Sequence, residues 1–506
     1  MDFISTHLLT TILFFPVLAA LVILFIPGDQ IKAIRWTALL ASLVPLGLSI
    51  WLWLGFDSTA AGFQFEEQYE WYAAINSTFH IGVDGLSLSM VLLTTILTPL
   101  AILASFNISD KVKAYMILFL LLETGMLGVF LALDLLIFFV FWEIGLVPMY
   151  FLINQWGSAN RNYASLKFFI YTMAGSLGLL LAIQMLGVLF QTYDIVTLAE
   201  RWSGLEASTL LGLSTSTVKT VAFWAFVVAF AIKVPVWPFH TWLPDAHTEA
   251  PTAGSMILAG VLLKLGAYGF LRLVLPFYPE EAAQFAGWLA FLAVMAIIFG
   301  AFGSYGQTDF KRLVAYSSIN HMGFVLLGIA AAAKAVGSLD ATIALNGAVL
   351  QMFNHGLSAA GMFFLVGVIY ERTHTRDLRQ FGGLFPLVPV YGTILIFTSM
   401  ASLGLPGLNG FVSEFMVVRG SWAILPVFTA VAMIGLLMTG AYILKGIKQV
   451  LHGPLNEHWA HGEHRLTEIN IREILVMAPL MILILVIGVW PMWILDVINK
   501  AMMMLF

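Results

Sequence analysis

The chain has 506 residues, of which 60% are hydrophobic and 10% are charged, and its formal net charge is −5. Because a soluble domain carries about 25% charged residues, this composition indicates an integral membrane protein, and the negative charge gives no sign of nucleic-acid binding. The absence of cysteine excludes thiolate zinc, iron–sulfur clusters, disulfides and thiol catalysis from this chain.

Apolar runs of about 20 residues, the length that crosses a bilayer, predict fourteen transmembrane helices. The first run, from His7 to Pro27, lacks a basic region and a cleavage site, so we expect a retained helix rather than a signal peptide. The longest connections are 57–84, 191–219 and 451–473. The sequence therefore predicts an all-α polytopic membrane protein without a separate soluble domain. The helices begin near His7, Arg35, Gly85, Val112, Leu135, Ala164, Thr220, Pro251, Ala286, Val314, Leu339, Val390, Ala423 and Ile474.

The orientation follows from the lysines and arginines of the loops, which accumulate on the inner side of a membrane. The loops after odd-numbered helices hold 15 of the 23 basic residues, and the opposite loops hold 6. The acidic 57–84 loop, which has no basic residue, belongs to the second set and should face outward. We therefore expect both termini on the outer, periplasmic side. Because no transit peptide is recognisable, we expect that membrane to be a bacterial plasma membrane.

Helix 7 and the helix after it each carry one lysine within an apolar run, Lys233 and Lys264. A lysine at bilayer depth costs roughly 2.5 kcal/mol or more on insertion scales. Lysines near helix ends commonly extend to the headgroups, but Lys264 is too central in its run for that. Pro235 and Pro238 should break helix 7 next to Lys233. A broken helix beside a buried charge is typical of an ion site in a transporter.

A weak internal repeat relates the two halves of the chain. Helix 12 contains SLGLPGLNGFVSEF, which should break as helix 7 does, and its Glu414 lies 181 residues after Lys233. Glu143 and His321, on helices 5 and 10, are 178 residues apart. A copy of five helices is an odd number, so the second copy would be inverted. We therefore divide the chain into helices 1–3 (residues 1–110), a first repeat (111–275), an inverted second repeat (285–450) and an inner loop with helix 14 (451–506).

Acidic side chains at membrane depth are Glu123, Glu143 and Glu414. Each is either protonated by desolvation or ionised against a cation. Glu143 has Lys233 as its obvious partner if helices 5 and 7 touch, although a structural hydrogen bond to a helix break is the alternative. Glu123 lies among small residues and has an equally simple structural explanation, a contact between helices.

The buried histidines, His321 and His355, suit proton relay because the histidine pKa lies near neutrality. Paired histidines also bind haem, but that requires two per helix pair for each haem. Four more histidines, His452 to His464, lie in a polar inner loop, where a metal site is the alternative to a solvated surface. Together with the acids and lysines, the buried histidines predict a polar row through the membrane. A pumping step along this row would break the Glu143–Lys233 ion pair and then protonate or deprotonate Lys233.

The segments KVPVWPFHTWLPDAHTEAPTAGS and LLKLGAYGFLR closely resemble the antiporter-like subunits of respiratory complex I and of Mrp-type sodium/proton antiporters, from about Lys113 to Lys448. The resemblance implies a proton-translocating membrane-arm subunit of a redox-driven NADH:quinone oxidoreductase. It implies that the matching residues take part in proton translocation: an ion pair in the first half-channel, a bridging lysine, two histidines and a terminal acid. These are Glu143, Lys233, Lys264, His321, His355 and Glu414, to which Glu123 is added.

The same resemblance implies partners and cofactors. Sister chains L and N generally have lysine where Glu414 stands, and chain L continues into a long lateral helix that the short tail after Val497 lacks. They are the expected neighbours, while NAD, FMN, iron–sulfur clusters and quinone are expected in other subunits and no cofactor in this chain. A ferredoxin-dependent or hydrogenase relative remains open. So does a sodium/proton antiporter, for which Asp134 or Glu123 would supply oxygen ligands, and so does a scaffold whose charges only lock helices together.

Overall fold

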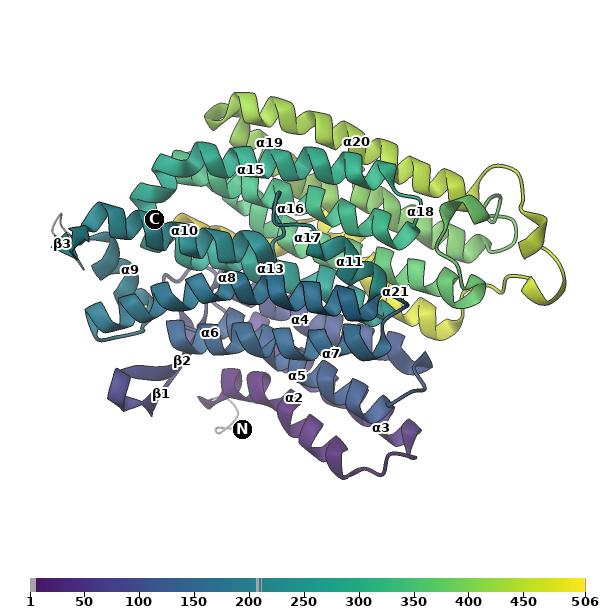
Figure 1. The fold of residues 1–506 in the computed structure, drawn as a ribbon, viewed down its shortest axis with the longest axis horizontal. Helices are drawn as coiled ribbons and strands as arrows, with labels where there is room; N and C mark the ends of the chain where they lie inside the picture. Colours follow the sequence, from purple (N-terminus) through teal and green to yellow (C-terminus); the bar gives the residue numbers. More distant parts are fainter. Residues whose placement is uncertain (1–5, 206–208, 211, 506) are drawn as a thin grey trace.

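The computed structural model describes residues 6–205, 209–210 and 212–505, which form a bundle of long helices (Figure 1). Among the described residues, thirteen helices are long and apolar enough to cross a membrane, and we count the interrupted pair α18 and α19 as the fourteenth crossing. The predicted all-α membrane fold is therefore confirmed. The uninterrupted crossings are α2 (Leu8–Phe25), α3 (Ile31–Gly55), α4 (Gly85–Ala104), α5 (Val112–Leu131), α8 (Arg161–Phe190), α15 (Pro279–Gly306), α16 (Phe310–Lys334), α17 (Leu339–Thr373), α20 (Pro426–Leu451) and α21 (Ile471–Val489).

Four crossings are interrupted, and they carry four of the predicted site residues, Glu143, Lys233, Lys264 and Glu414, whereas His321 and His355 lie on the uninterrupted α16 and α17. The fifth is split at Gly145 into α6 (Leu135–Ile144) and α7 (Leu146–Trp156). The seventh consists of α10 (Thr215–Lys233) and α11 (Trp242–Glu249), and the twelfth of α18 (Pro389–Leu403) and α19 (Asn409–Ile424). The eighth joins α12 (Thr252–Ile257), α13 (Leu263–Gly269) and α14 (Leu275–Phe277) through the π-helical turns η3 (Leu258–Leu262) and η4 (Phe270–Val274).

Both predicted helix breaks are confirmed. The helix α10 ends at Lys233, just before Pro235 and Pro238, which lack the backbone N–H that a helix interior needs. The helix α18 ends at Gly404, whose φ of +82° favours a residue without a side chain. Each break leaves backbone groups free inside the bundle, a situation tolerated in membranes only where protein or water satisfies them.

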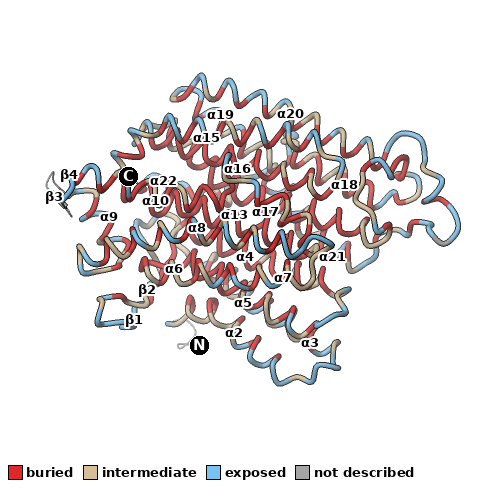
Figure 2. The backbone as a smooth tube through the Cα atoms, viewed as in Figure 1, coloured by how far each residue is buried: buried red, intermediate tan, exposed pale blue. Residues whose placement is uncertain are grey.

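The helices differ strongly in how much protein surrounds them (Figure 2). In the most apolar 18-residue stretch of the crossing Thr252–Phe277 and of α17 every residue is buried, and in that of α16 94% are buried. In the corresponding stretches of α3, α20 and α21 only 33% of the residues are buried, so much of their apolar surface is left uncovered by this chain. The innermost helices are the ones that carry Lys264, His321 and His355, so the row lies in the core.

The acidic 57–84 segment forms a hairpin that the sequence analysis did not predict. Strands β1 (Gln64–Tyr72) and β2 (Ser77–Val83) pair antiparallel. Glu67 is buried and accepts hydrogen bonds from the backbone N–H of Leu9 and the Thr10 hydroxyl, at 2.7 and 2.5 Å. These bonds satisfy donors at the start of α2, where a carboxylate also complements the helix dipole. The segment's acidity thus has a structural use.

The other connections are short elements. The segment 191–219 contains the helix α9 (Ile195–Ser203) and a small hairpin of β3 (Thr209–Leu210) and β4 (Leu213–Ser214). After α21 the chain ends in the helix α22 (Met492–Met503), which packs beside the start of α4. The hairpin, α9 and the C-terminus lie toward one end of the molecule, and the loop 452–470 lies at the opposite end (Figure 1).

His80 joins the hairpin to α9. Its Nδ1 lies 3.0 Å from Asp194, the N-cap of α9, and its Nε2 lies 2.9 Å from Glu66 on β1. Burial alone would lower the pKa of His80, but the hydrogen bonds and charges of Asp194 and Glu66 outweigh it and raise the pKa. Both ring nitrogens face carboxylates, an arrangement that suits imidazolium.

We expect the hairpin to be held less firmly as pH rises. A raised folded-state pKa gives stability that is present in acid and lost as pH rises through that raised value. Hydrogen exchange of the hairpin amides should therefore speed up beyond the intrinsic rate as the pH rises above about 6.5, the ordinary pKa of histidine. His80→Gln should speed exchange about tenfold below this pH, since a hydrogen bond to a charged group contributes about 1.5 kcal/mol. The exposed His452→Gln is the control, and equal protection below and above this pH would contradict the assignment.

Candidate functional site

Lys233 lies at the end of α10 with 2% of its surface exposed. Its Nζ is 5.0 Å from the ring centre of Trp142 and 5.9 Å from that of Phe168. The indole of Trp142 is fixed by a 3.0 Å hydrogen bond from its Nε1 to Ser176. Aromatic faces stabilise a desolvated cation by about 2 kcal/mol, so the ammonium has a site that is polar without being a fixed salt bridge.

Helices 5 and 7 touch, as the pairing hypothesis requires, but its predicted direct contact is wrong. The Trp142 ring packs edge-on against Phe230, 5.4 Å between centres, which brings α6 to α10. Among the described residues, no ion pair within 4.0 Å joins Glu143 to Lys233, and Oε1 of Glu143 has no hydrogen-bond partner; the Lys233 ammonium lies over the Trp142 ring instead. The half-buried Glu143 acts on Lys233 only through space.

Glu123 is fully buried on α5, and neither of its carboxyl oxygens has a hydrogen-bond partner within the described chain. Such a group is costly unless it is neutral or hydrated. Its helix also contacts α6, because Gly125 approaches the backbone of Gly145 so closely that a Cβ there would lie 2.7 Å from the Gly145 nitrogen. Glu123 therefore has no structural partner that would explain a carboxyl group here.

Lys264 lies at the centre of the molecule. It follows the π-helical turn Leu258–Leu262, and its ammonium donates to the Ala259 carbonyl within that turn. Such turns shift a carbonyl out of the regular ladder and are frequent at functional sites. The same ammonium lies 2.7 Å from Nδ1 of His355 on α17. The predicted bridging position of Lys264 thus has a defined partner.

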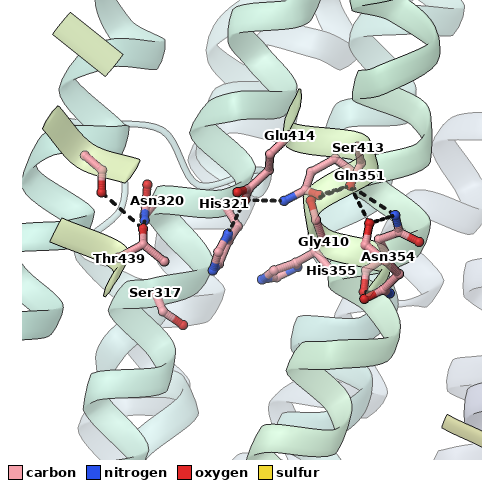
Figure 3. Close-up of polar contacts among 12 residues, drawn as sticks. Ser317, Asn320, His321, Gln351, Asn354, His355, Gly410, Ser413, Glu414 and Thr439 are labelled. Carbon is pink, nitrogen blue, oxygen red and sulfur yellow. Dashed lines mark hydrogen bonds and ion pairs between the residues drawn. The ribbon is translucent and has the colours of Figure 1, made fainter. Parts of the chain in front are cut away.

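From His355 the row continues to His321 and Glu414 (Figure 3). The two imidazole centres are 5.5 Å apart, and Nδ1 of His321 lies 2.7 Å from Oε1 of Glu414. The Nε2 atom of His355 and Oε2 of Glu414 are buried without a hydrogen-bond partner in the described residues. One buried line therefore runs from Lys264 through His355 and His321 to Glu414. Glu143 and Lys233 lie on the fifth and seventh crossings, which precede the crossing of Lys264 in the sequence.

Polar side chains that the sequence analysis did not select surround the end of this line. Gln351 lies three residues before Asn354 and four before His355, so it shares a face of α17 with both. Asn320 bonds Thr439 at 2.5 Å, and the Tyr442 hydroxyl lies 3.3 Å from Nε2 of His321. These uncharged polar residues on one helix face are visible in the sequence, but they do not stand out as a charge in an apolar run does. His247, fully buried and stacked 4.3 Å from Phe363, was missed among the loop histidines.

The geometry also bears on the alternative interpretations. The Nε2 atom of His321, the nitrogen that usually ligates haem iron, lies 3.3 Å from the Tyr442 hydroxyl, which does not suit shared haem ligation by His321 and His355. Asp134, a candidate sodium ligand, caps α6 through the N–H groups of Leu136 and Ile137 and also binds Ser77. In the described part of the chain, no group of three or more His, Asp or Glu side chains is placed to hold a metal ion.

Known families and proteins resemble this chain over most of its length. The family described as NADH:quinone oxidoreductase/Mrp antiporter, TM, matches residues 132–439, and that described as NADH-ubiquinone oxidoreductase chain 4, amino terminus, matches residues 58–134. NADH-quinone oxidoreductase subunit M of Rhodobacter capsulatus is 40% identical over 98% of this chain and 95% of its own. NADH-ubiquinone oxidoreductase chain 4 of Arabidopsis thaliana is 38% identical over 96% and 94%.

Solved structures agree. A chain of respiratory complex I from Thermus thermophilus with bound NADH superposes with a TM-score of 0.84 at 27% identity, covering 98% of this chain and 99% of that one. A chain of the Mrp complex from Dietzia has a TM-score of 0.82 at 19% identity over 98% and 97%, which shows a shared fold. The chain therefore belongs to the NADH:quinone oxidoreductase/Mrp antiporter membrane-subunit family, in the branch of subunit M, also called chain 4.

Proposed function

We propose that this chain is the subunit M of a proton-pumping NADH:quinone oxidoreductase and moves protons along Glu143, Lys233, Lys264, His355, His321 and Glu414. The observation that supports this most directly is the buried line of Lys264, His355, His321 and Glu414, with contacts of 2.7 Å at both ends. Groups that exchange protons near neutral pH and lie within one water molecule of each other form a relay. The 5.5 Å between the imidazole centres is such a separation.

The breaks of helices 7 and 12 lie near the two ends of the proposed proton route. Lys233 ends the first half of helix 7, and Glu414 lies in the second half of helix 12, beside Gly404. Residues 111–275 and 285–450 form the two inverted repeats in this proposal, with protons taken up from the inner side through the first and released outward through the second. Both termini then lie on the outer side of a bacterial plasma membrane, with the hairpin and α9.

The electron chemistry belongs to partner subunits. NAD, FMN, iron–sulfur clusters and quinone bind there, and this chain, which has no cysteine, holds no cofactor. The sister chains L and N are the proposed neighbours. The apolar faces of α3, α20 and α21, where only 33% of the residues in the most apolar stretch are buried, are available for subunits and lipid.

The test is Lys264→Met in the intact complex, assayed for quinone reduction by NADH and for proton pumping, with assembly followed on a native gel. Losing the ammonium removes the contact to His355, so pumping should fall about threefold or more while the complex assembles. Lys264→Arg keeps the charge but does not release its proton, so it should also assemble and pump poorly. The exposed Lys334→Met on α16 is the control. Unchanged pumping in an assembled complex would refute this route, and failed assembly of both Lys264 variants would favour the scaffold function.

The same membranes distinguish the cation specificity. A proton pump should acidify the outer side without external sodium and without sodium-ion uptake. If pumping required sodium and moved it in fixed proportion, the antiporter alternative would replace the proposal.

A further inference from the structure

Glu414 is held by an uncharged side chain that none of the roles proposed above includes. Gln351, 2% exposed on α17, donates from Nε2 to Oε1 of Glu414 at 2.9 Å (Figure 3). This is the same carboxyl oxygen that lies 2.7 Å from Nδ1 of His321. A histidine from one helix and an amide from another therefore converge on a single oxygen atom.

The orientation of the Gln351 amide is set by a directed chain of hydrogen bonds. The Asn354 amide donates to the Ser413 hydroxyl at 3.0 Å, and that hydroxyl donates to Oε1 of Gln351 at 2.5 Å. Because the Ser413 hydroxyl supplies its proton to the carbonyl end, the other end of the amide, which only donates, must face Glu414. The same Nδ2 atom of Asn354 also donates to the Asn409 carbonyl at 2.7 Å, which holds this amide group in place, whereas its Oδ1 has no hydrogen-bond partner among the described residues.

We propose that Gln351 is a positioning residue for proton transfer between His321 and Glu414, an inference that rests on the proposed function. Its N–H holds Oε1 toward Nδ1 of His321 and keeps this oxygen an acceptor. In the step itself, the N–H bond of the imidazolium breaks and an O–H bond forms on Glu414, so that a cation and a carboxylate become two neutral groups. Oε2 has no hydrogen-bond partner among the described residues and lies on the side of the helix break at Gly404, so rotation of the protonated carboxyl group would carry its O–H bond to that side for the next transfer.

A space-filling role alone would not require this arrangement. An apolar side chain of the same length would fill the site, whereas a buried amide is unfavourable unless both of its ends are paired. Here both ends are paired, one of them to an ionisable group. The other ionisable groups facing the pair are His355 and Lys264 on the inner helices and Tyr442 on α20, which contacts the opposite nitrogen of His321.

The test compares Gln351→Met and Gln351→Glu in the assembled complex. Gln351→Met has nearly the same shape but no donor, so proton pumping should fall about tenfold at every pH, as expected for a lost hydrogen bond to a charged group. Gln351→Glu donates only when protonated. It should therefore pump best in acid and lose pumping progressively as pH rises, relative to the wild type, a profile that a purely structural residue would not produce.

Two further variants make the result decisive. Asn346→Leu removes a buried amide from the same helix that bonds Asn499, at 2.6 Å, and should leave the shape of the pH profile unchanged. Glu414→Gln tests the proposed function separately. Suppose that Glu414→Gln impairs pumping. If both Gln351 variants then pump normally, or if Gln351→Glu loses pumping equally at all pH values as Gln351→Met does, the role of Gln351 is refuted and the route stands. If Glu414→Gln also pumps normally, the route itself fails at this end.

Discussion

Lys233→Ala is expected to abolish proton pumping and to lower quinone reduction at least about tenfold, which corresponds to ~1.4 kcal/mol on the barrier. The ammonium lies over the ring of Trp142 at the end of α10, so it is buried without a fixed salt bridge and is free to change partner. Alanine lacks the ammonium group, which is the only group of the Lys233 side chain that can bind and release a proton. Because pumping and electron transfer are coupled in the proposed complex, both activities should fall together.

The measurement uses membranes that carry the assembled variant complex, verified on a native gel. Lys233→Arg is the matched variant, which keeps the charge but does not release its proton, so it should assemble and still fail to pump. The exposed Lys334→Ala on α16 is the control for loss of a positive charge elsewhere. An assembled Lys233→Ala complex with normal activity would remove this lysine from the route.

Much of the fold could be predicted because hydrophobic length and proline position act locally. The crossings, and the breaks after Lys233 and at Gly404, follow from the cost of unpaired backbone groups in lipid. The hairpin of residues 64–83 could not be predicted in the same way. Its stability comes from contacts with distant segments, such as Glu67 with the start of α2 and His80 with Asp194, and a run of acidic residues looks like a solvated loop.

The ionisable members of the site were recognisable because a charge in an apolar run is expensive and therefore conspicuous. Which of them touch was not recognisable. The sequence suggested a direct Glu143–Lys233 pair, whereas the ammonium lies over Trp142, an aromatic residue that reads as ordinary membrane composition. Gln351 was missed for a related reason: a single amide is common in a helix, and its importance depends on where Ser413 and Glu414 lie in another helix.

The two acids of the first half should differ in importance, although both are at membrane depth. Glu143→Gln removes the charge that acts through space on Lys233, so pumping should fall about tenfold or more. Glu123 has no hydrogen-bond partner in the described chain and is fully buried, which favours its neutral form and leaves little for glutamine to change. Glu123→Gln should therefore reduce pumping no more than about twofold.

The double variant Glu123→Gln/Glu143→Gln separates two explanations of any activity left in the single variants. If Glu123 ionises and replaces Glu143 when that charge is lost, the double variant should lose far more than the two single effects combined, because coupled groups are not additive. If Glu143 alone serves Lys233, the double variant should match Glu143→Gln. Equal losses of pumping in the two single variants would contradict the expected difference between Glu143 and Glu123. Glu123 would then exchange its proton despite its burial and would belong to the proton route.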